Sequence, residues 1–430
     1  MFSSESDFNQ GLLAFIDASP TPFHAVQTLR KSLDAAGFSA LKETDRWGTL
    51  AAGKYYVTRN DSSIIAFVLT DADLAENGLS LVGAHTDSPC LKIKPKPEKV
   101  SQGYWQLGVE VYGGALLNPW FDRDLSLAGR VSYLTSQGQI NHALVNFEKP
   151  LATIPSLAIH LDREVNQNRS INPQLHIVPL LSQTEAGEHA DFRTMLTQQL
   201  RSQHAGLDIA QVLDYEICLF DTQPAAVIGL NDAFISAARL DNLLSCFTGL
   251  QALLSADSSR SCMLVCTDHE EVGSLSTSGA QGTFLEAVLQ RLAHTNENYQ
   301  RMIQHSMLIS ADNAHGIHPN YADRHDSNHG PLLNQGPVIK TNANQRYATN
   351  SETSARFKQL CQQIDVPLQD FVVRTDMACG STIGPITAGQ IGIKTLDIGV
   401  PTFAMHSIRE LAGSRDAWLL CRALKHFFNS

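Results

Sequence analysis

Two kinds of apolar pattern alternate along the chain. Short uninterrupted apolar runs predict buried strands, and stretches with apolar residues at helical spacing lie between them. The predicted strands include residues 63–69, 79–84, 263–266, 307–311 and 394–400. Helices are predicted at 7–19 and 24–36, and another amphipathic helix closes the chain from about residue 416. This alternation is typical of an α/β fold.

A region with a different pattern interrupts the α/β segments. Short β-like runs separated by turns such as Gly113-Gly114 and Gln137-Gly138 dominate it, and few helical periods occur before residue 191. The runs lie at 104–111, 128–134, 152–161 and 175–180. We therefore predict an α/β three-layer sandwich around a mixed sheet, formed by residues 1–96 and 229–430, with an inserted β-rich domain at 97–228.

Two adjacent acidic residues follow one of the predicted strands. Glu270 and Glu271 come just after the run 263–266 and precede a small Gly-Ser loop. In open α/β sheets, ligands bind at this end of the strands. Two carboxylates in a dry cleft repel each other, so a divalent metal is the usual counter-charge, with one carboxylate as ligand and the other as general base. A solvated acidic turn is the alternative interpretation of the pair taken alone.

Other potential ligands also stand at the ends of predicted elements. His85 follows the run 79–84, and Asp87 could accept a hydrogen bond from its far ring nitrogen and fix the metal-binding tautomer. A strand-end histidine can equally be a satisfied core or surface residue. Asp241 opens an apolar helix that continues through Leu254, where an acidic residue is usually an N-cap but could equally face a metal.

The strand-end residues together form a set of two histidines and three carboxylates. The members are His85, Asp241, Glu271, Asp312 and His406. Mixed nitrogen and oxygen ligands suit zinc, with cobalt or manganese as possible substitutes. Five ligands exceed the need of one zinc and match two ions if one carboxylate bridges them. The sequence therefore predicts a two-metal hydrolase with Glu270 as the general base.

Composition narrows the classes of partner and location. The chain has 430 residues, 43% of them hydrophobic, which is enough for more than one domain. Its formal net charge of −11 argues against nucleic acid or an anionic membrane as the main partner. The eight cysteines show no paired framework, so we interpret them as buried reduced thiols. Neither a signal-like start nor an apolar run of about 20 residues is evident, so the cytoplasm is the expected location.

Five segments of the chain resemble the aspartyl aminopeptidase family, a branch of the dinuclear zinc metallopeptidases. They are Gly83-Ala84-His85-Thr86-Asp87-Ser88-Pro89, Leu240-Asp241-Asn242, Asp268-His269-Glu270-Glu271-Val272-Gly273, Ser310-Ala311-Asp312-Asn313-Ala314-His315 and Met405-His406-Ser407. The resemblance covers nearly the whole chain, including the inserted domain and residues 342–350. It implies a fold like that of the zinc peptidases, and no metal position departs from the family pattern.

The resemblance implies a role for each ligand and two zinc ions per subunit. Asp241 bridges the ions, His85 and Asp312 complete one site, and Glu271 and His406 complete the other. In related dinuclear peptidases the peptide bond after the bridging aspartate is cis, so we expect a cis bond after Asp241.

The resemblance also assigns the chemistry of the neighbouring residues. Asp87 supports His85, and Glu270 takes a proton from the attacking water and passes it to the leaving amine. The implied activity removes N-terminal residues, with Asp or Glu preferred, from peptides with a free amine.

Further residues resemble the family's substrate-binding groups. Lys340 resembles the residue that meets the acidic side chain of the substrate, with His315 and Tyr347 as its companions, although a surface lysine is the ordinary interpretation of such a position. His160 resembles a histidine that reaches the active site of a neighbouring subunit and holds the substrate carbonyl. A buried strand histidine and a third metal histidine are the alternatives for His160.

The resemblance implies a homo-oligomer in which the inserted domain forms a dimer and a larger closed assembly, such as a dodecamer. Two other functions stay open on the sequence. One is a related two-metal carboxypeptidase or amidase. The other is a non-catalytic peptide-binding protein that retains the fold, against which the intact Glu270 argues.

Overall fold

The computed structural model describes residues 2, 4–184, 191–257 and 259–430, and it divides into two compact units. Unit 1 comprises Met1–Ser88, Ala225–Met405 and Glu410–Ser430, and unit 2 comprises Pro89–Pro224 and His406–Arg409. Unit 2 begins before the predicted boundary at 97 because β5 (Cys90–Ser101) is a strand of its sheet. It ends before 228 because β11 (Ala226–Ile228) pairs with a strand of unit 1.

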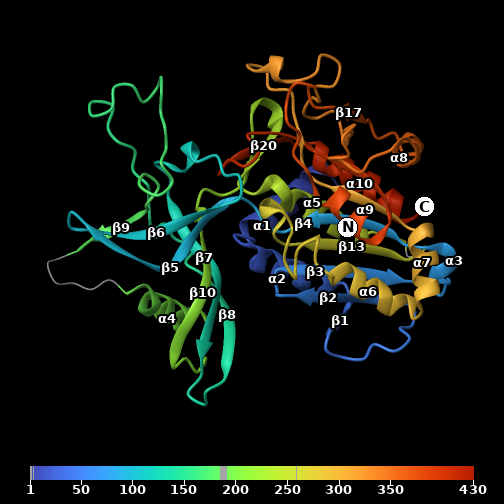
Figure 1. The fold of residues 1–430 in the computed structure, drawn as a ribbon, viewed down its shortest axis with the longest axis horizontal. Helices are drawn as coiled ribbons and strands as arrows, with labels where there is room; N and C mark the ends of the chain where they lie inside the picture. The colour runs from blue at the N-terminus through green and yellow to red at the C-terminus, as the bar shows by residue number, and fades with distance from the viewer. Residues whose placement is uncertain (1, 3, 185–190, 258) are drawn as a thin grey trace. The chain divides into compact units, whose positions relative to one another are not determined.

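A nine-stranded mixed sheet forms the centre of unit 1 (Figure 1). Its strands, in spatial order, are β1 (Ser39–Leu41), β2 (Gly53–Arg59), β3 (Ser63–Leu69), β13 (Cys262–Thr267), β4 (Ser80–His85), β14 (Met307–Ala311), β18 (Lys394–Gly399), β16 (Val338–Lys340) and β17 (Gln369–Phe371). The four consecutive strands β13, β4, β14 and β18 are parallel, whereas β3 and β16 flank them in antiparallel pairs. The mixed sheet confirms the predicted fold class.

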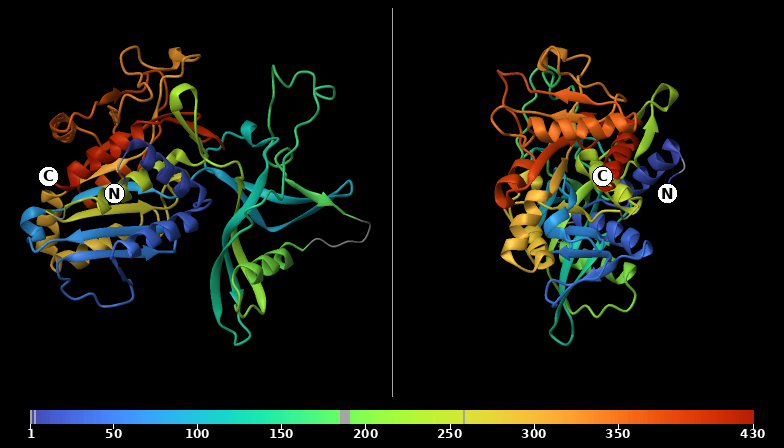
Figure 2. Two further views of the ribbon diagram at one scale, coloured as in Figure 1. Left: turned by 180° about the vertical axis from the view of Figure 1, so that it is seen from behind. Right: turned by 90° about the vertical axis from the view of Figure 1, so that its right-hand side faces the viewer.

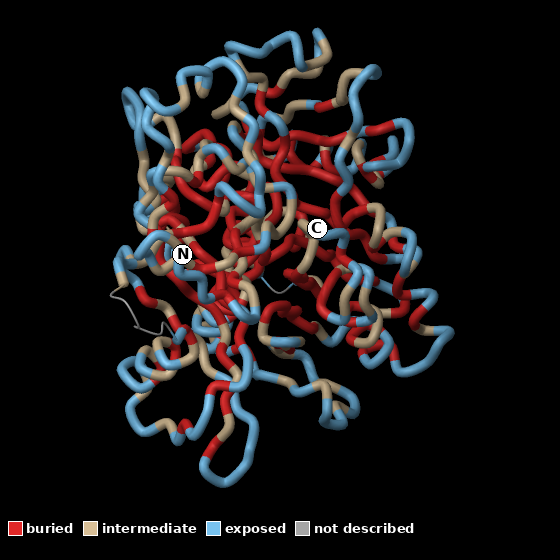
Figure 3. The backbone as a smooth tube through the Cα atoms, turned by 60° about the vertical axis from the view of Figure 1, so that its left-hand side comes forward, coloured by how far each residue is buried: buried red, intermediate tan, exposed pale blue. Residues whose placement is uncertain are grey.

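Both faces of this sheet are covered, which gives three layers. In β3, Ile64, Ala66 and Val68 belong to one hydrophobic cluster, and Ile65 and Phe67 belong to another. This split follows from the period of two in a strand, because successive side chains point to opposite faces. The central strands are accordingly buried along their length, as Figure 3 shows in red.

Helices supply the outer layers of unit 1. The first cluster is covered by α1 (Glu5–Asp17), α2 (Pro22–Ala35), α5 (Leu240–Leu254), α8 (Ser351–Gln363) and α10 (Asp416–Phe428), and the second by α6 (Phe284–Ala293) and α7 (Asn296–His305). The shorter helices are α3 (Leu74–Asn77), α9 (Ile383–Ile391), η2 (Leu230–Asp232), η3 (Glu270–Val272) and η4 (Ala322–Arg324). Local sequence determines where the first helices begin. The Ser4 side chain accepts the N–H of Asp7 at 3.1 Å, and Pro22 has the fixed φ that suits a first helical position.

A second, five-stranded sheet belongs to unit 1. Its order is β11, β12 (Phe234–Ala237), β20 (Glu410–Gly413), β19 (Pro401–Phe403) and β15 (Ala314–His315). Strand β12 leads into α5 and pairs antiparallel with β20, with Ala237 opposite Glu410. This pairing brings a residue near the end of the chain close to the start of α5.

Unit 2 is built on a six-stranded antiparallel sheet, which Figure 2 shows from behind. Its order is β8 (Ile140–Asn146), β7 (Leu125–Leu134), β10 (Gln211–Asp221), β5, β6 (Tyr104–Tyr112) and β9 (Leu180–Gln183). The unit also contains η1 (Asn118–Trp120) and α4 (Phe192–Gln203), whose residues Phe192, Leu196 and Leu200 join the hydrophobic cluster of the sheet. The β-rich character matches the prediction, and the polar stretch 184–205 contains the expected helix, although residues 185–190 lie outside the described residues.

Two predicted strands of unit 2 were wrong. In the run 175–180, only Leu180 belongs to a strand. The run 152–161 forms only isolated bridges at Ala152 and Thr153. Its alternating apolar residues Leu157, Ile159 and Leu161 imitate a strand, but all three side chains are exposed. Among the described residues, no helix combines the length and the apolar character that a membrane crossing requires.

Candidate metal centre

Parallel strands of unit 1 deliver the candidate residues to one edge of the sheet. β4 ends at His85, which lies opposite Thr267 at the end of β13. Glu270 and Glu271 follow β13 in η3, and Asp312 follows β14. The carboxyl ends of adjacent parallel strands meet at the same edge, so these side chains converge there.

The structure brings four of the five predicted ligands together. His85, Asp241 and Glu271 each offer a ligand atom, and these atoms all lie within 4.8 Å of one another. The Nε2 atom of His85 is 3.3 Å from Oδ1 of Asp241 and 3.6 Å from Oδ1 of Asp312. His85, Asp241 and Asp312 are all buried. The peptide bond between Asp241 and Asn242 is cis, which confirms that expectation.

Asp87 has more contacts than the sequence predicted. Its main-chain oxygen is 3.1 Å and its Oδ1 atom 3.4 Å from Nδ1 of His85, in agreement with a supporting role. In addition, its two carboxylate oxygens accept the backbone N–H groups of Glu270 and Glu271, each at 3.1 Å. One buried carboxylate therefore orients a predicted ligand and fixes the backbone of the Glu-Glu pair.

Burial and the crowding of acidic groups shift the pKa values at the centre. Burial, together with the neighbouring Asp312 and Asp241 carboxylates, raises the pKa of Glu270 to about 8. Burial and the Asp241 carboxylate raise the pKa of Glu271 well above its usual value. Burial alone would lower the pKa of His85, but its contacts with the surrounding carboxylates raise it well above the usual range.

These residues fit a zinc centre on their own chemistry. Imidazole nitrogen and carboxylate oxygen are the donors that zinc takes in catalytic sites. The donors converge within reach of a single ion. A bound cation would also relieve the repulsion that raises the pKa values of Glu270 and Glu271.

Lys340 lies beside the cluster, on β16. It is only 2% exposed, and its Nζ atom is 3.2 Å from the main-chain oxygen of Asn313 and 3.5 Å from Oδ2 of Asp312. Nζ is also 5.1 Å from the ring centre of Tyr347. Burial would raise the pKa of Asp312, but the ammonium group of Lys340 lowers it. The ordinary expectation of a surface lysine therefore does not hold.

The predicted companions of Lys340 occupy different environments. Tyr347 is buried, and burial followed by the neighbouring Cys379 raises its pKa. His315 is exposed, and its ring centre is 5.7 Å from that of Phe371, which lies opposite Lys340 across the β16–β17 pair. Lys340 and Tyr347 thus contact each other directly, and His315 approaches them through Phe371.

Two predicted residues belong to unit 2. His160 lies in the exposed stretch after the bridge at Thr153. His406 lies in the segment His406–Arg409, and its Nδ1 atom is 3.2 Å from the main-chain oxygen of Gly114. The roles of His160 and His406 at the centre stay predictions.

The sequence did not single out Asp397, which is buried in β18. Its Oδ1 accepts the hydroxyl of Thr382 at 2.6 Å, and its Oδ2 accepts the N–H of Ala348 at 2.6 Å. Asp397 therefore fixes the segment that carries Tyr347. The available signal was an acidic residue in the middle of an apolar run, because such a residue is rarely buried without partners.

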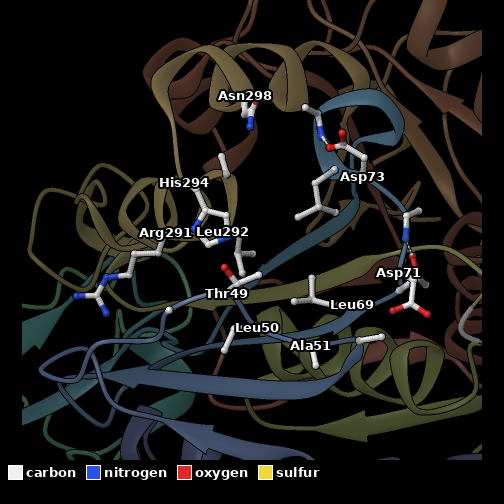
Figure 4. Close-up of a pocket in the computed structure, with 17 residues that line it drawn as sticks. Thr49, Leu50, Ala51, Leu69, Asp71, Asp73, Arg291, Leu292, His294 and Asn298 are labelled. Atoms are coloured by element: carbon white, nitrogen blue, oxygen red, sulfur yellow. Dashed lines mark hydrogen bonds between the residues drawn. The ribbon is translucent and has the colours of Figure 1, made fainter.

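A cavity of about 310 Å³ lies away from this centre (Figure 4). It opens beside Leu69, whose neighbour Val68 pairs with Cys262 at the start of β13, so it lies at the opposite edge of the sheet. Asp71 and Asp73 lie on one side of it, and Arg291 and His294 on the other. None of the candidate metal or substrate residues lines this cavity.

The fold and the centre define an α/β protein of the metallopeptidase class. Residues 15–428 match the family model described as aminopeptidase I zinc metalloprotease (M18), and the chain belongs to this family. It is thus a hydrolase that cleaves peptides at the N-terminus. This assignment confirms the resemblance to zinc aminopeptidases drawn from the sequence.

Named relatives agree with the family. The chain is 62% identical over 424 residues to a probable M18 family aminopeptidase 2 of Stutzerimonas stutzeri (strain A1501). The matched region covers 99% of this chain and 98% of that protein. A structure of the Ape4 and Nbr1 complex matches with a TM-score of 0.95 and 41% identity, covering 99% of this chain and 86% of that one. The S. cerevisiae mApe1 dodecamer matches with a TM-score of 0.85 and 29% identity, covering 98% of this chain and 96% of that one.

Proposed function

We propose that this chain removes N-terminal residues, preferably Asp or Glu, from peptides with the help of two zinc ions per subunit. The observation that carries the proposal is the convergence of His85, Asp241 and Glu271, with the Oε2 atom of Glu270 only 4.0 Å from Nε2 of His85. His85 and Asp312 would hold one ion and Glu271 and His406 the other, with Asp241 shared between them. Cobalt or manganese would be possible substitutes.

When bound, the ions would supply Lewis-acid activation of water and of the scissile carbonyl. Glu270 is the candidate general base because it is mostly buried beside the ligands without being needed as one. Its raised pKa of about 8 would fall in the presence of a nearby cation, toward the range that suits proton transfer near neutral pH. Glu270 then takes a proton from the attacking water and gives it to the leaving amine.

The proposed acidic preference rests on Lys340. A buried ammonium group is costly unless it is paired, so a substrate carboxylate would be favoured over an uncharged side chain. In this structure Lys340 already contacts Asp312, so the substrate carboxylate would be its second acidic partner. The contact with Tyr347 restricts the position of the ammonium group further.

The proposed assembly is a homo-oligomer with a dimer formed through unit 2. The exposed apolar residues Leu157, Ile159 and Leu161 flank His160 and would be covered in such a dimer. His160 would then reach the partner's active site. The S. cerevisiae relative is described as a dodecamer, which supports a larger closed assembly for this chain. The cytoplasm stays the proposed location.

Metal analysis combined with a substrate screen tests the proposal. The purified protein should contain two zinc ions per subunit, lose activity with a chelator and regain it with zinc. Matched peptides that begin with Asp, Glu, Ala or Leu should be cleaved with a strong preference for the first two. A peptide with an acetylated N-terminal Asp is the control and should resist cleavage. Equal rates on the four free peptides would contradict the acidic preference, and cleavage of the acetylated peptide would indicate a different amidase.

A further inference from the structure

Helix α5 begins without a cap from its own sequence. The N-cap residue Arg239 has a left-handed backbone (φ 59°), and its side chain makes no capping hydrogen bond. The first N–H groups of a helix have no partner inside the helix, and a side chain next to them usually accepts one. In α5 the N–H of Asp241 donates instead to Oε2 of Glu410, at 3.0 Å.

The fold places Glu410 at this position from far along the chain. Glu410 is only 2% exposed and is the first residue of β20. It lies opposite Ala237 at the end of β12, the strand that leads into α5. Glu410 therefore fixes the backbone of Asp241 at the start of α5, where Asp241 and Asn242 do not have helical φ and ψ.

The backbone of Asp241 is also held on its other side. Its carbonyl oxygen accepts the hydroxyl of Ser88 at 2.6 Å. The next residue, Asn242, donates from Nδ2 to the main-chain oxygen of Ala311 at 3.0 Å, directly before Asp312. With its backbone held in this way, Asp241 directs its carboxylate to the cluster, where Oδ1 is 3.3 Å from Nε2 of His85.

We propose that Glu410 is a positioning residue of the metal centre. It accepts the N–H group of Asp241 and, together with the contacts of Ser88 and Asn242, holds the backbone from which the Asp241 carboxylate reaches the cluster. Glu410 itself is not proposed to touch metal or substrate. This inference rests on the proposed role of Asp241 as a zinc ligand, and it predicts an effect on zinc affinity rather than on fold alone.

Variants that change either the length or the charge of the Glu410 side chain test the inference. Glu410→Gln keeps the length of the side chain and an acceptor oxygen, so zinc affinity, measured by competition with a chelator, should stay within about threefold of the native value. Glu410→Asp keeps the charge but is shorter, so it should weaken zinc binding by about tenfold or more, as should Glu410→Ala. The Gln and Asp pair is informative even if the Ala variant does not fold.

Asp416→Asn is a matched control in the same unit. Asp416 is a buried carboxylate that accepts the backbone N–H groups of Asn334 and Gly336, away from the cluster. The substitution Asp416→Asn should lower the unfolding temperature of the protein without changing its zinc affinity. The inference is overturned if Glu410→Asp binds zinc as the native protein does, if Glu410→Gln is the weaker of the two, or if Asp416→Asn weakens zinc binding equally.

A separate variant distinguishes failure of this inference from failure of the proposed function. Asp241→Ala should lose zinc. If Asp241→Ala binds zinc with native affinity, the ligand assignment itself is wrong. If Asp241→Ala loses zinc while the short and truncated Glu410 variants retain it, only the positioning role is wrong.

Discussion

The two units bury their strands in different ways. In unit 1, β3, β4, β13 and β14 are buried along their whole length, because helices cover both faces of the sheet. In unit 2, most residues of β6 and β8 are exposed or half-buried rather than buried. A strand covered on both faces holds the residues at its end in a fixed position, which suits catalysis. A strand with an open face offers a surface, which suits assembly.

If unit 1 carries the chemistry, the largest effect should come from Glu270. We expect Glu270→Gln to lower kcat by about 10²–10⁴-fold or more while zinc content is unchanged, because Glu270 is a general base and not a ligand. Glu271→Ala is the matched variant and should lose zinc. Measurement of kcat and zinc per subunit checks both. A near-native kcat in Glu270→Gln would show that the base is another group.

The role of unit 2 is tested by His160. We expect His160→Ala to lower kcat by about 10²–10³-fold, the usual effect of removing one group that stabilises a reacting carbonyl. If the histidine acts on a neighbouring subunit, inactive His160→Ala and inactive Glu270→Gln proteins should regain part of the activity after subunit exchange. Absence of recovery, with exchange demonstrated by mass spectrometry, would assign His160 to its own subunit or to no catalytic role.

A substitution of Lys340 tests whether unit 1 also determines the preference for acidic N-terminal residues. Lys340→Met should lower kcat/KM for Asp-peptides by about 10²-fold or more and remove the preference over Leu-peptides. Lys340→Met also removes a positive charge next to the proposed ligand Asp312, so zinc affinity should rise rather than fall. Zinc titration beside the kinetics separates the two effects, and unchanged discrimination between the peptides would exclude Lys340 as the specificity residue.

Stability should also differ between the units. Leu264→Ala in β13 and Leu127→Ala in β7 remove equally buried side chains from different hydrophobic clusters. Each should cost about 2–5 kcal/mol, and hydrogen exchange should rise mainly in the unit that carries the change. Ile140→Ala is the control, because Ile140 is 69% exposed and should change stability by no more than about 0.5 kcal/mol. If both variants raise hydrogen exchange equally in both units, the two units unfold together.

The smallest expected effect concerns how the stability of unit 1 depends on pH. Burial, followed by the charge of Arg239, lowers the pKa of His24 to about 4. The unfolded chain therefore binds a proton more readily, and unit 1 should lose up to about 3 kcal/mol of stability as the pH falls from about 6.5 to 4. In His24→Gln this part of the pH dependence should disappear. Denaturant unfolding at several pH values checks it, and an unchanged slope would assign the acid sensitivity to other groups.

The sequence was informative where local pattern and chemistry coincide. A buried strand followed by polar residues predicted that His85, Glu271 and Asp312 lie close together, and the alternation of elements predicted the three layers. The same reliance on pattern produced the error at 152–161, where Leu157, Ile159 and Leu161 have the period of a strand. A strand also needs a partner with which to exchange hydrogen bonds, and pattern within one segment does not contain that information.

The roles of Asp87 and Glu410 could not be predicted in full for a related reason. Asp87 accepts N–H groups from residues more than 180 positions away, and Glu410 accepts one from 169 positions away. Hydrogen bonds of this kind depend on which strands are neighbours in space. Sequence spacing indicates only the contact of Asp87 with His85, two residues before it.

The division of one strand between two hydrophobic clusters limits how this protein can change. In β13, Cys262, Leu264 and Cys266 face one layer, whereas Met263 and Val265 face the other. Inserting or deleting a single residue would exchange the two faces and also shift Glu270 and Glu271 away from the groups that hold them. Side chains in β13 can therefore be substituted one at a time, but the length of the segment from Cys262 to Glu271 cannot vary without loss of both the core and the centre.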